Sequence, residues 1–97
     1  MLKKNAQPLS KALSDFFEKN SALKNKMAEH RAIRGWSEVL GEAVSKYTGN
    51  VYFNRGVLYV QLTSAVLRAE LLMNKEGLIK KLNDYAGLPI IRDIVIR

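Results

Sequence analysis

The sequence contains no cysteine, which excludes disulfide scaffolds, thiolate zinc sites and cysteine nucleophiles. Its single histidine, His30, is too few for a polyhistidine metal site. The longest uncharged stretch near the middle, Gly56 to Leu67, is too short for a membrane span of about 20 apolar residues. No Gly-rich phosphate-binding motif is present. We therefore expect a non-enzymatic protein without catalytic residues, metal, cofactor, small-molecule substrate or membrane contact.

The N-terminal residues carry no apolar run. Lys3 and Lys4 are followed by polar residues, so we expect no signal peptide and a cytoplasmic location. Residues 1–7 have no periodicity, and we expect them to be disordered. Residues 8–97 are predicted to form a single domain, because 97 residues with 47% apolar content suffice for one modest core and not for two.

Positive charge dominates the sequence and is unevenly distributed. The net charge is +7, of which residues 1–34 contribute +5, residues 35–74 none and residues 75–97 the remaining +2. A positive field of this kind attracts polyanions such as nucleic acids, acidic proteins or anionic surfaces. A solvated helical surface that only keeps the protein soluble is the alternative.

Apolar residues at steps of three or four predict two helices in the first half of the chain. The first begins at Pro8, which suits an initial helical position. The second begins after Ser21 as its N-cap and ends at Gly49. Gly35 interrupts the second pattern, so either one bent helix or two helices meeting near Arg34 and Gly35 fit it.

The second half of the chain combines strand and helix signals. Residues 51–53 and 57–62 are rich in β-branched and aromatic side chains, and the turn between them places Arg55 at the tip of a β-hairpin. Thr63 or Ser64 caps a third helix, whose buried side is predicted to carry Leu67, Leu71 and Leu72. A fourth helix over residues 78–86 ends at Gly87, and a strand follows over residues 90–97.

The predicted order is α-α-β-β-α-α-β, an α+β fold. A strand–helix–helix–strand crossover favours parallel neighbours, so the last strand should pair parallel to residues 57–62. This gives a three-stranded mixed sheet with helices packed on one face. We expect six side chains to be mostly buried in its core: Trp36, Leu40, Leu58, Val60, Leu71 and Leu82.

The αββααβ part of this order is that of a type II KH domain, and several blocks of residues resemble the DciA family. They are Trp36 to Gly41, Asn54 to Val60, Thr63-Ser64, Glu70-Leu71, Leu78 to Asn83 and Ile94 to Arg97. The resemblance spans about residues 8–97. It implies a KH-like domain that binds DNA and engages the bacterial replicative helicase as a loader or operator, with a nucleoid-associated location.

Lysine and arginine side chains are the candidate DNA-binding residues, because phosphate contacts bind without reading sequence. The candidates are Lys24, Lys26, Arg31, Arg34, Arg55, Lys80 and Lys81. At helical spacing, Lys24, Arg31 and Arg34 share one stripe. Residues 74–77 occupy the place of the KH Gly-x-x-Gly loop, but Asn74 replaces the first glycine and Glu76 adds negative charge, which favours a plain turn.

Other candidate sites have simpler explanations. Trp36 is in register with the apolar helical face and is expected in the core, whereas Tyr52 or Tyr59 could stack bases if exposed on the sheet.

The sequence thus favours a non-enzymatic, DNA-binding adaptor acting with the replicative helicase. A protein-interaction module whose basic face binds an acidic partner, and an RNA-binding KH-like protein, are the alternatives.

Overall fold

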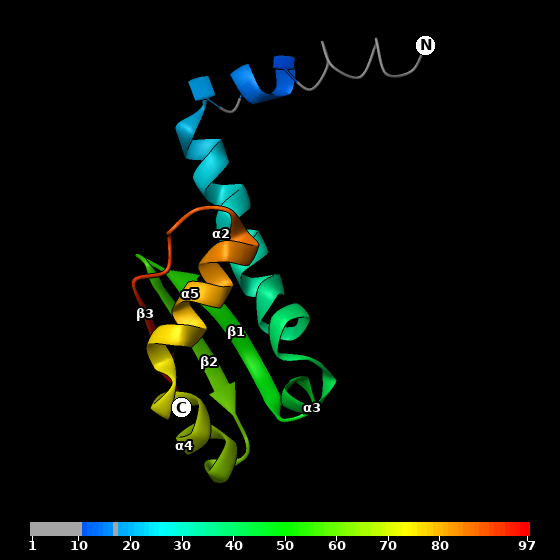
Figure 1. Ribbon diagram of the computed structural model, residues 1–97, viewed down its shortest axis with the longest axis vertical. Coiled ribbons are helices and arrows are strands. Elements are labelled where there is room, and N and C mark those ends of the chain that lie inside the picture. Colours follow the sequence, from blue (N-terminus) through cyan, green and yellow to red (C-terminus); the bar gives the residue numbers. More distant parts are fainter. Residues whose placement is uncertain (1–10, 17) are drawn as a thin grey trace.

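Two long helices lie on one face of a three-stranded sheet in the computed structural model (Figure 1), which describes residues 11–16 and 18–97. Residues 11–16 are helical and lead toward α2 (Ser21–Leu40). The elements that follow are α3 (Glu42–Ser45), β1 (Thr48–Asn54), β2 (Val57–Leu62), α4 (Ala65–Met73), α5 (Lys75–Ala86) and β3 (Asp93–Ile96). The expectations for residues 1–7 and for a helix start at Pro8 lie outside the described residues.

The sheet has the predicted topology. Its order is β1-β2-β3, with β1 antiparallel to β2, and β2 parallel to β3 through pairs such as Leu58 with Ile94. The parallel pairing follows from the α4–α5 crossover, which carries the chain back to the same end of the sheet. The α+β fold with a three-stranded mixed sheet is therefore confirmed and agrees with a KH-like description.

The turn between β1 and β2 consists of two residues. Arg55 and Gly56 both have positive φ, 50° and 84°. This is the backbone of a type I′ turn, whose twist matches that of the flanking strands. The predicted hairpin with Arg55 at its tip is confirmed.

The second predicted helix differs from the expectation at both ends and in the middle. Asn20, not Ser21, occupies the N-cap, and its side chain makes no capping bond. The helix runs unbroken through Gly35 and ends before Gly41, where φ is +84°; the short α3 follows as an additional element. Gly49 does not end a helix but lies in β1. The apolar period continues past Gly41, and periodicity alone could not separate the two helices.

Gly35 is a point of close helix approach rather than a break. A Cβ atom there would lie 2.9 Å from the Tyr85 ring of α5 and 3.5 Å from Leu82. The missing side chain lets α2 pack tightly against α5, and the helical hydrogen bonds continue through it. A glycine in a helix interior costs about 1 kcal/mol of propensity, which this close packing offsets.

The core lies between the α2–α5 layer and the inner side of the sheet. Trp36, Leu58, Val60 and Leu82 are buried as predicted, whereas Leu40 and Leu71 are only half-buried and pack against that core. The buried side predicted for α4 is wrong at Leu72, which is 42% exposed. The α4 helix has few neighbours, so only one narrow side of it reaches the core.

Side-chain hydrogen bonds fix the start of α4 and the segment that follows α5. The Ser64 hydroxyl accepts a hydrogen bond from the Leu67 backbone N–H at 3.2 Å, as predicted for the start of α4. The Asn83 side chain both donates to the Ile91 carbonyl, at 3.0 Å, and accepts from the Ile91 N–H, at 2.9 Å. This pair of bonds holds the segment after α5 in place, so that β3 enters the sheet in register.

Candidate nucleic-acid interface

The four basic residues predicted on α2 lie along two adjoining rows of the helix surface. Lys24 and Arg31 line one hollow, together with Ser14, Glu18 and Met27. Lys26 and Arg34 are exposed elsewhere on the helix, at positions eight residues apart, with the exposed His30 midway between them. Residues at steps of four share a helix surface, so these three side chains form a second, fully exposed row. Arg34 follows Arg31 by three residues, so it adjoins the row of Lys24 and Arg31 as well as the row of Lys26 and His30.

Arg31 has a structural role that the sequence did not reveal. Its Nε donates a hydrogen bond of 2.8 Å to the backbone carbonyl of Ala86, the last residue of α5. A cation at a helix C-terminus satisfies an otherwise unpaired carbonyl and interacts favourably with the helix dipole. Arg31 therefore ties α2 to α5, and its substitution would disturb the fold as well as the surface charge.

The two lysines on α2 have only loose carboxylate partners. Lys24 Nζ lies 3.9 Å from Glu18, and Lys26 Nζ lies 3.9 Å from Glu29. Exposed pairs at this distance contribute between about 0 and 1 kcal/mol and dissociate readily in favour of another anion. Within the described part of the chain, Arg34 forms no ion pair. These cations are therefore available to phosphate.

Lys80 and Lys81 extend the basic surface onto α5. Both are exposed, and α5 packs beside the second half of α2, from Arg31 onward, whereas the first half of α2 projects beyond the end of α5 (Figure 1). The helices run antiparallel, because Arg31 meets Ala86 whereas Gly35, one turn later on α2, meets Leu82. We call the cations of this layer the α2–α5 basic surface. Its members are the half-buried Lys24 and the exposed Lys26, Arg34, Lys80 and Lys81, with Arg31 at its edge.

Arg55 belongs to a different part of the molecule. At the hairpin tip its carbonyl accepts a 3.1 Å hydrogen bond from Arg92 Nε, so two guanidinium-bearing residues meet there. The Arg92 side chain also covers Gly56, where a Cβ atom would lie 2.8 Å from Arg92 Nε. Arg92 is not among the candidates chosen from the sequence. It lies 37 residues after Arg55 in the chain, directly before β3, and only the crossover brings it to the hairpin.

The corner between α4 and α5 does not form a phosphate-binding loop. Asn74 is the only residue between the two helices, and Gly77 lies within the first turn of α5 beside Glu76. A Gly-x-x-Gly loop needs a backbone that projects between helix ends. The predicted plain turn is confirmed, and KH-type backbone clamping has no structural basis at this corner.

The aromatic candidates divide between the core and the surface. Trp36 is 1% exposed, and its Nε1 donates a 3.0 Å hydrogen bond to Thr48 Oγ1, which assigns it to the core as predicted. Tyr52 and Tyr59 are cross-strand partners on the side of the sheet away from the helices. Tyr52 is 49% exposed. The tyrosine rings are therefore accessible for base stacking, whereas the buried Trp36 ring is not.

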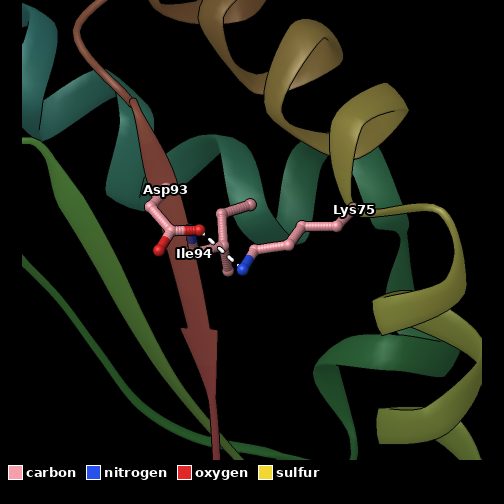
Figure 2. A network of polar contacts seen from close by, with 3 residues as sticks. All are labelled: Lys75, Asp93 and Ile94. Atoms are coloured by element: carbon pink, nitrogen blue, oxygen red, sulfur yellow. Dashed lines mark hydrogen bonds and ion pairs between the residues drawn. The ribbon is translucent and has the colours of Figure 1, made fainter.

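One carboxylate on the sheet is neutralised by a specific partner. Lys75 Nζ lies 2.6 Å from Asp93 Oδ1, and the same oxygen accepts a 2.8 Å bond from the Ile94 N–H (Figure 2). The Lys75 contact, followed by the Ile94 N–H, holds the pKa of the Asp93 carboxyl below its ordinary value of 3.8. Both contacts favour the charged form.

A lowered carboxyl pKa has a defined effect on stability. The Asp93 contribution is fully present above the unfolded-state pKa and is lost as the pH falls through the lower folded-state pKa. We expect Asp93→Asn to unfold at a lower urea concentration than the parent at pH 7, with the difference shrinking well below pH 3.8. A difference that stays constant across this range would contradict the assignment.

The described residues contain neither a metal-binding cluster nor a helix suited to spanning a membrane. Among residues 11–16 and 18–97, no three histidine, cysteine or acidic side chains gather as a metal site would require. No helix within these ranges is both long and apolar enough to cross a membrane.

Comparison with known proteins confirms the family resemblance of the sequence. No curated protein and no solved structure gives a match. Residues 8–96, nearly the whole chain, match the family described as Dna[CI] antecedent, DciA. The chain therefore belongs to the DciA family, a family related to the helicase loaders of DNA replication and not a catalytic one.

Proposed function

We propose that the protein is a non-enzymatic DNA-binding adaptor that acts with the replicative helicase at the nucleoid. The observation that carries the DNA-binding part is the α2–α5 basic surface. Five cations from two adjacent helices lie on it, four of them exposed and Lys24 half-buried. Their only ion pairs within the described chain are the loose contacts of Lys24 and Lys26. Family membership supports the role in replication and the helicase as partner.

Binding through this surface would be independent of sequence. Lysine and arginine contacts to phosphate position a protein on DNA but carry no base information. The proposed ligand is therefore DNA as a polyanion.

Salt dependence tests the proposal. If binding neutralises about four phosphates, log affinity should fall against log salt concentration with a slope of about −3 to −4. Fluorescence anisotropy with single-stranded DNA, duplex DNA and RNA of equal length measures this slope and the preference among the three. Absence of binding at about 50 mM salt, or a slope near zero, would reject DNA binding through phosphates. Tighter binding to RNA would favour an RNA-binding role.

A protein-interaction module is the second candidate, and α4 supplies the observation in its favour. Val66 is 74% exposed and Met73 is 87% exposed, beside a groove between α3 and α4 that also includes the half-exposed Tyr47. Apolar side chains exposed together are typical of protein contact surfaces. Capture of purified replicative helicase without any DNA binding would support this candidate over the first.

A further inference from the structure

The side of the sheet away from the helices carries a row of apolar and aromatic side chains. Tyr52 of β1 lies opposite Tyr59 of β2, which lies opposite Val95 of β3. The tyrosine rings are stacked, with centroids 4.7 Å apart and planes 11° from parallel. We call this side of the sheet the open face. Tyr52 keeps half of its surface exposed there, so one side of the stacked pair remains accessible.

A hollow of about 220 Å³ adjoins the two tyrosines. Besides the rings, it is lined by three polar side chains: Asn50 of β1, Gln61 of β2 and Arg97, which directly follows β3. The pairing of β1 with β2 shifts between Thr48 and Val51, so a β-bulge lies at Gly49 and Asn50. Bulges reorient side chains and are frequent beside functional sites. Here the bulge lies at the edge of the hollow, and a Cβ at Gly49 would lie 2.9 Å from Gln61 Oε1.

The charge on the open face favours an anionic ligand. The Arg97 guanidinium carbon lies 5.6 Å from the centre of the Tyr59 ring, a cation–π distance that holds the positive charge beside the aromatic pair. Asp93 is the only carboxylate in the three strands, and Lys75 neutralises it. No uncompensated acidic group of the strands therefore opposes a phosphate near the hollow.

The chemistry of these groups matches that of an unstacked nucleotide. Aromatic rings stack on bases of any sequence, amide side chains donate to and accept from base edges, and an arginine binds phosphate. We infer that the open face binds one or two bases of a single-stranded nucleic acid, with Tyr52 as the stacking platform and Arg97 beside the phosphate. This inference rests on the proposed DNA binding and adds a second contact surface to the α2–α5 basic surface.

Substitution at Tyr52 tests the inference with a matched control. Tyr52→Val keeps a β-branched residue suited to a strand but removes the ring, whereas Tyr52→Phe keeps the ring. We expect the valine variant to bind single-stranded DNA about five- to a hundredfold more weakly than the parent, and the phenylalanine variant to bind like the parent. Affinity for duplex DNA should not change, because its bases are already stacked.

Photocrosslinking gives an independent measurement that does not depend on a variant folding correctly. An oligonucleotide containing 5-iododeoxyuridine, irradiated with the parent protein, should crosslink to the peptide that contains Tyr52 or Tyr59. Crosslinks found only on α2 or α5 would overturn the inference. Unchanged single-strand affinity of Tyr52→Val would overturn it as well.

The possible outcomes distinguish this inference from the proposed function. If the parent binds no DNA at low salt, the proposed function itself fails. If the parent binds with steep salt dependence but Tyr52→Val binds equally well, only the open-face site is rejected. If Tyr52→Val loses capture of the helicase while keeping its single-strand affinity, the open face is a protein-docking surface and the inference is wrong.

Discussion

Reversing three cations of the α2–α5 basic surface that lie on α2 should weaken DNA binding at least about tenfold, with little change in melting temperature. The variant carries Lys24→Glu, Lys26→Glu and Arg34→Glu, which lowers the net charge from +7 to +1 because each reversal subtracts two units. Each lost phosphate contact removes one released counterion and replaces attraction with repulsion. Arg31 is left intact, since its bond to the Ala86 carbonyl stabilises the contact between α2 and α5.

Single reversals provide the matched control for this experiment. Arg34→Glu and Lys46→Glu change the net charge equally, and both side chains are exposed. Lys46 follows α3, outside the α2–α5 basic surface. We expect the Arg34 variant to lose more affinity and more salt dependence than the Lys46 variant in the same anisotropy titration. Equal losses would mean that net charge alone attracts DNA, and an unaffected triple variant would place binding elsewhere.

Replacing the buried indole should give the largest loss of stability. Trp36→Ala is expected to lower the free energy of unfolding by roughly 3–5 kcal/mol, a large share of the 5–15 kcal/mol typical of small proteins. Trp36 is 1% exposed and is one of the largest fully buried side chains. Its loss would leave a cavity between α2 and the sheet, where the surrounding backbone can collapse only partly.

The hydrogen bond of Trp36 requires a separate control. Trp36 Nε1 donates to Thr48 Oγ1, whose hydroxyl donates in turn to the Val44 carbonyl at 2.8 Å. Trp36→Phe removes the indole donor but fills most of the volume, so it should cost much less than the alanine variant. Urea denaturation followed by circular dichroism measures both losses. A loss below about 1 kcal/mol for the alanine variant would contradict burial of the ring.

Local sequence patterns were sufficient for the elements whose signals are short-range. The hairpin at Arg55 and Gly56 follows from β-branched runs on both sides of a turn that tolerates positive φ. The cap at Ser64 follows in the same way, because it involves atoms within three residues of one another. The parallel position of β3 was also predictable, since handedness leaves few routes for a two-helix crossover.

The helix boundaries were less predictable, because regularly spaced apolar residues can continue across the point where one helix ends and the next begins. Leu40 and Val44 are in register with Trp36, and yet α2 and α3 are separated at Gly41. At Gly35 the sequence left two interpretations, because a glycine in a helical pattern can either break the helix or allow close packing of a neighbouring helix. The Tyr85 ring, 50 residues later in the chain, decides that it is a close contact.

The amino-acid sequence by itself determined the order of the strands and of the helices other than α3, the topology of the sheet and the excess of positive charge in residues 1–34, because periodicity, turn chemistry and composition are local or additive properties. Only the tertiary structure decided which cations are free and which aromatic rings are exposed. Arg31 is bound to the end of α5, Arg92 meets Arg55 at the hairpin, and Tyr52 stacks on Tyr59 beside Arg97. Each of these contacts joins different secondary-structure elements, so it depends on strand register and helix packing that no local pattern encodes.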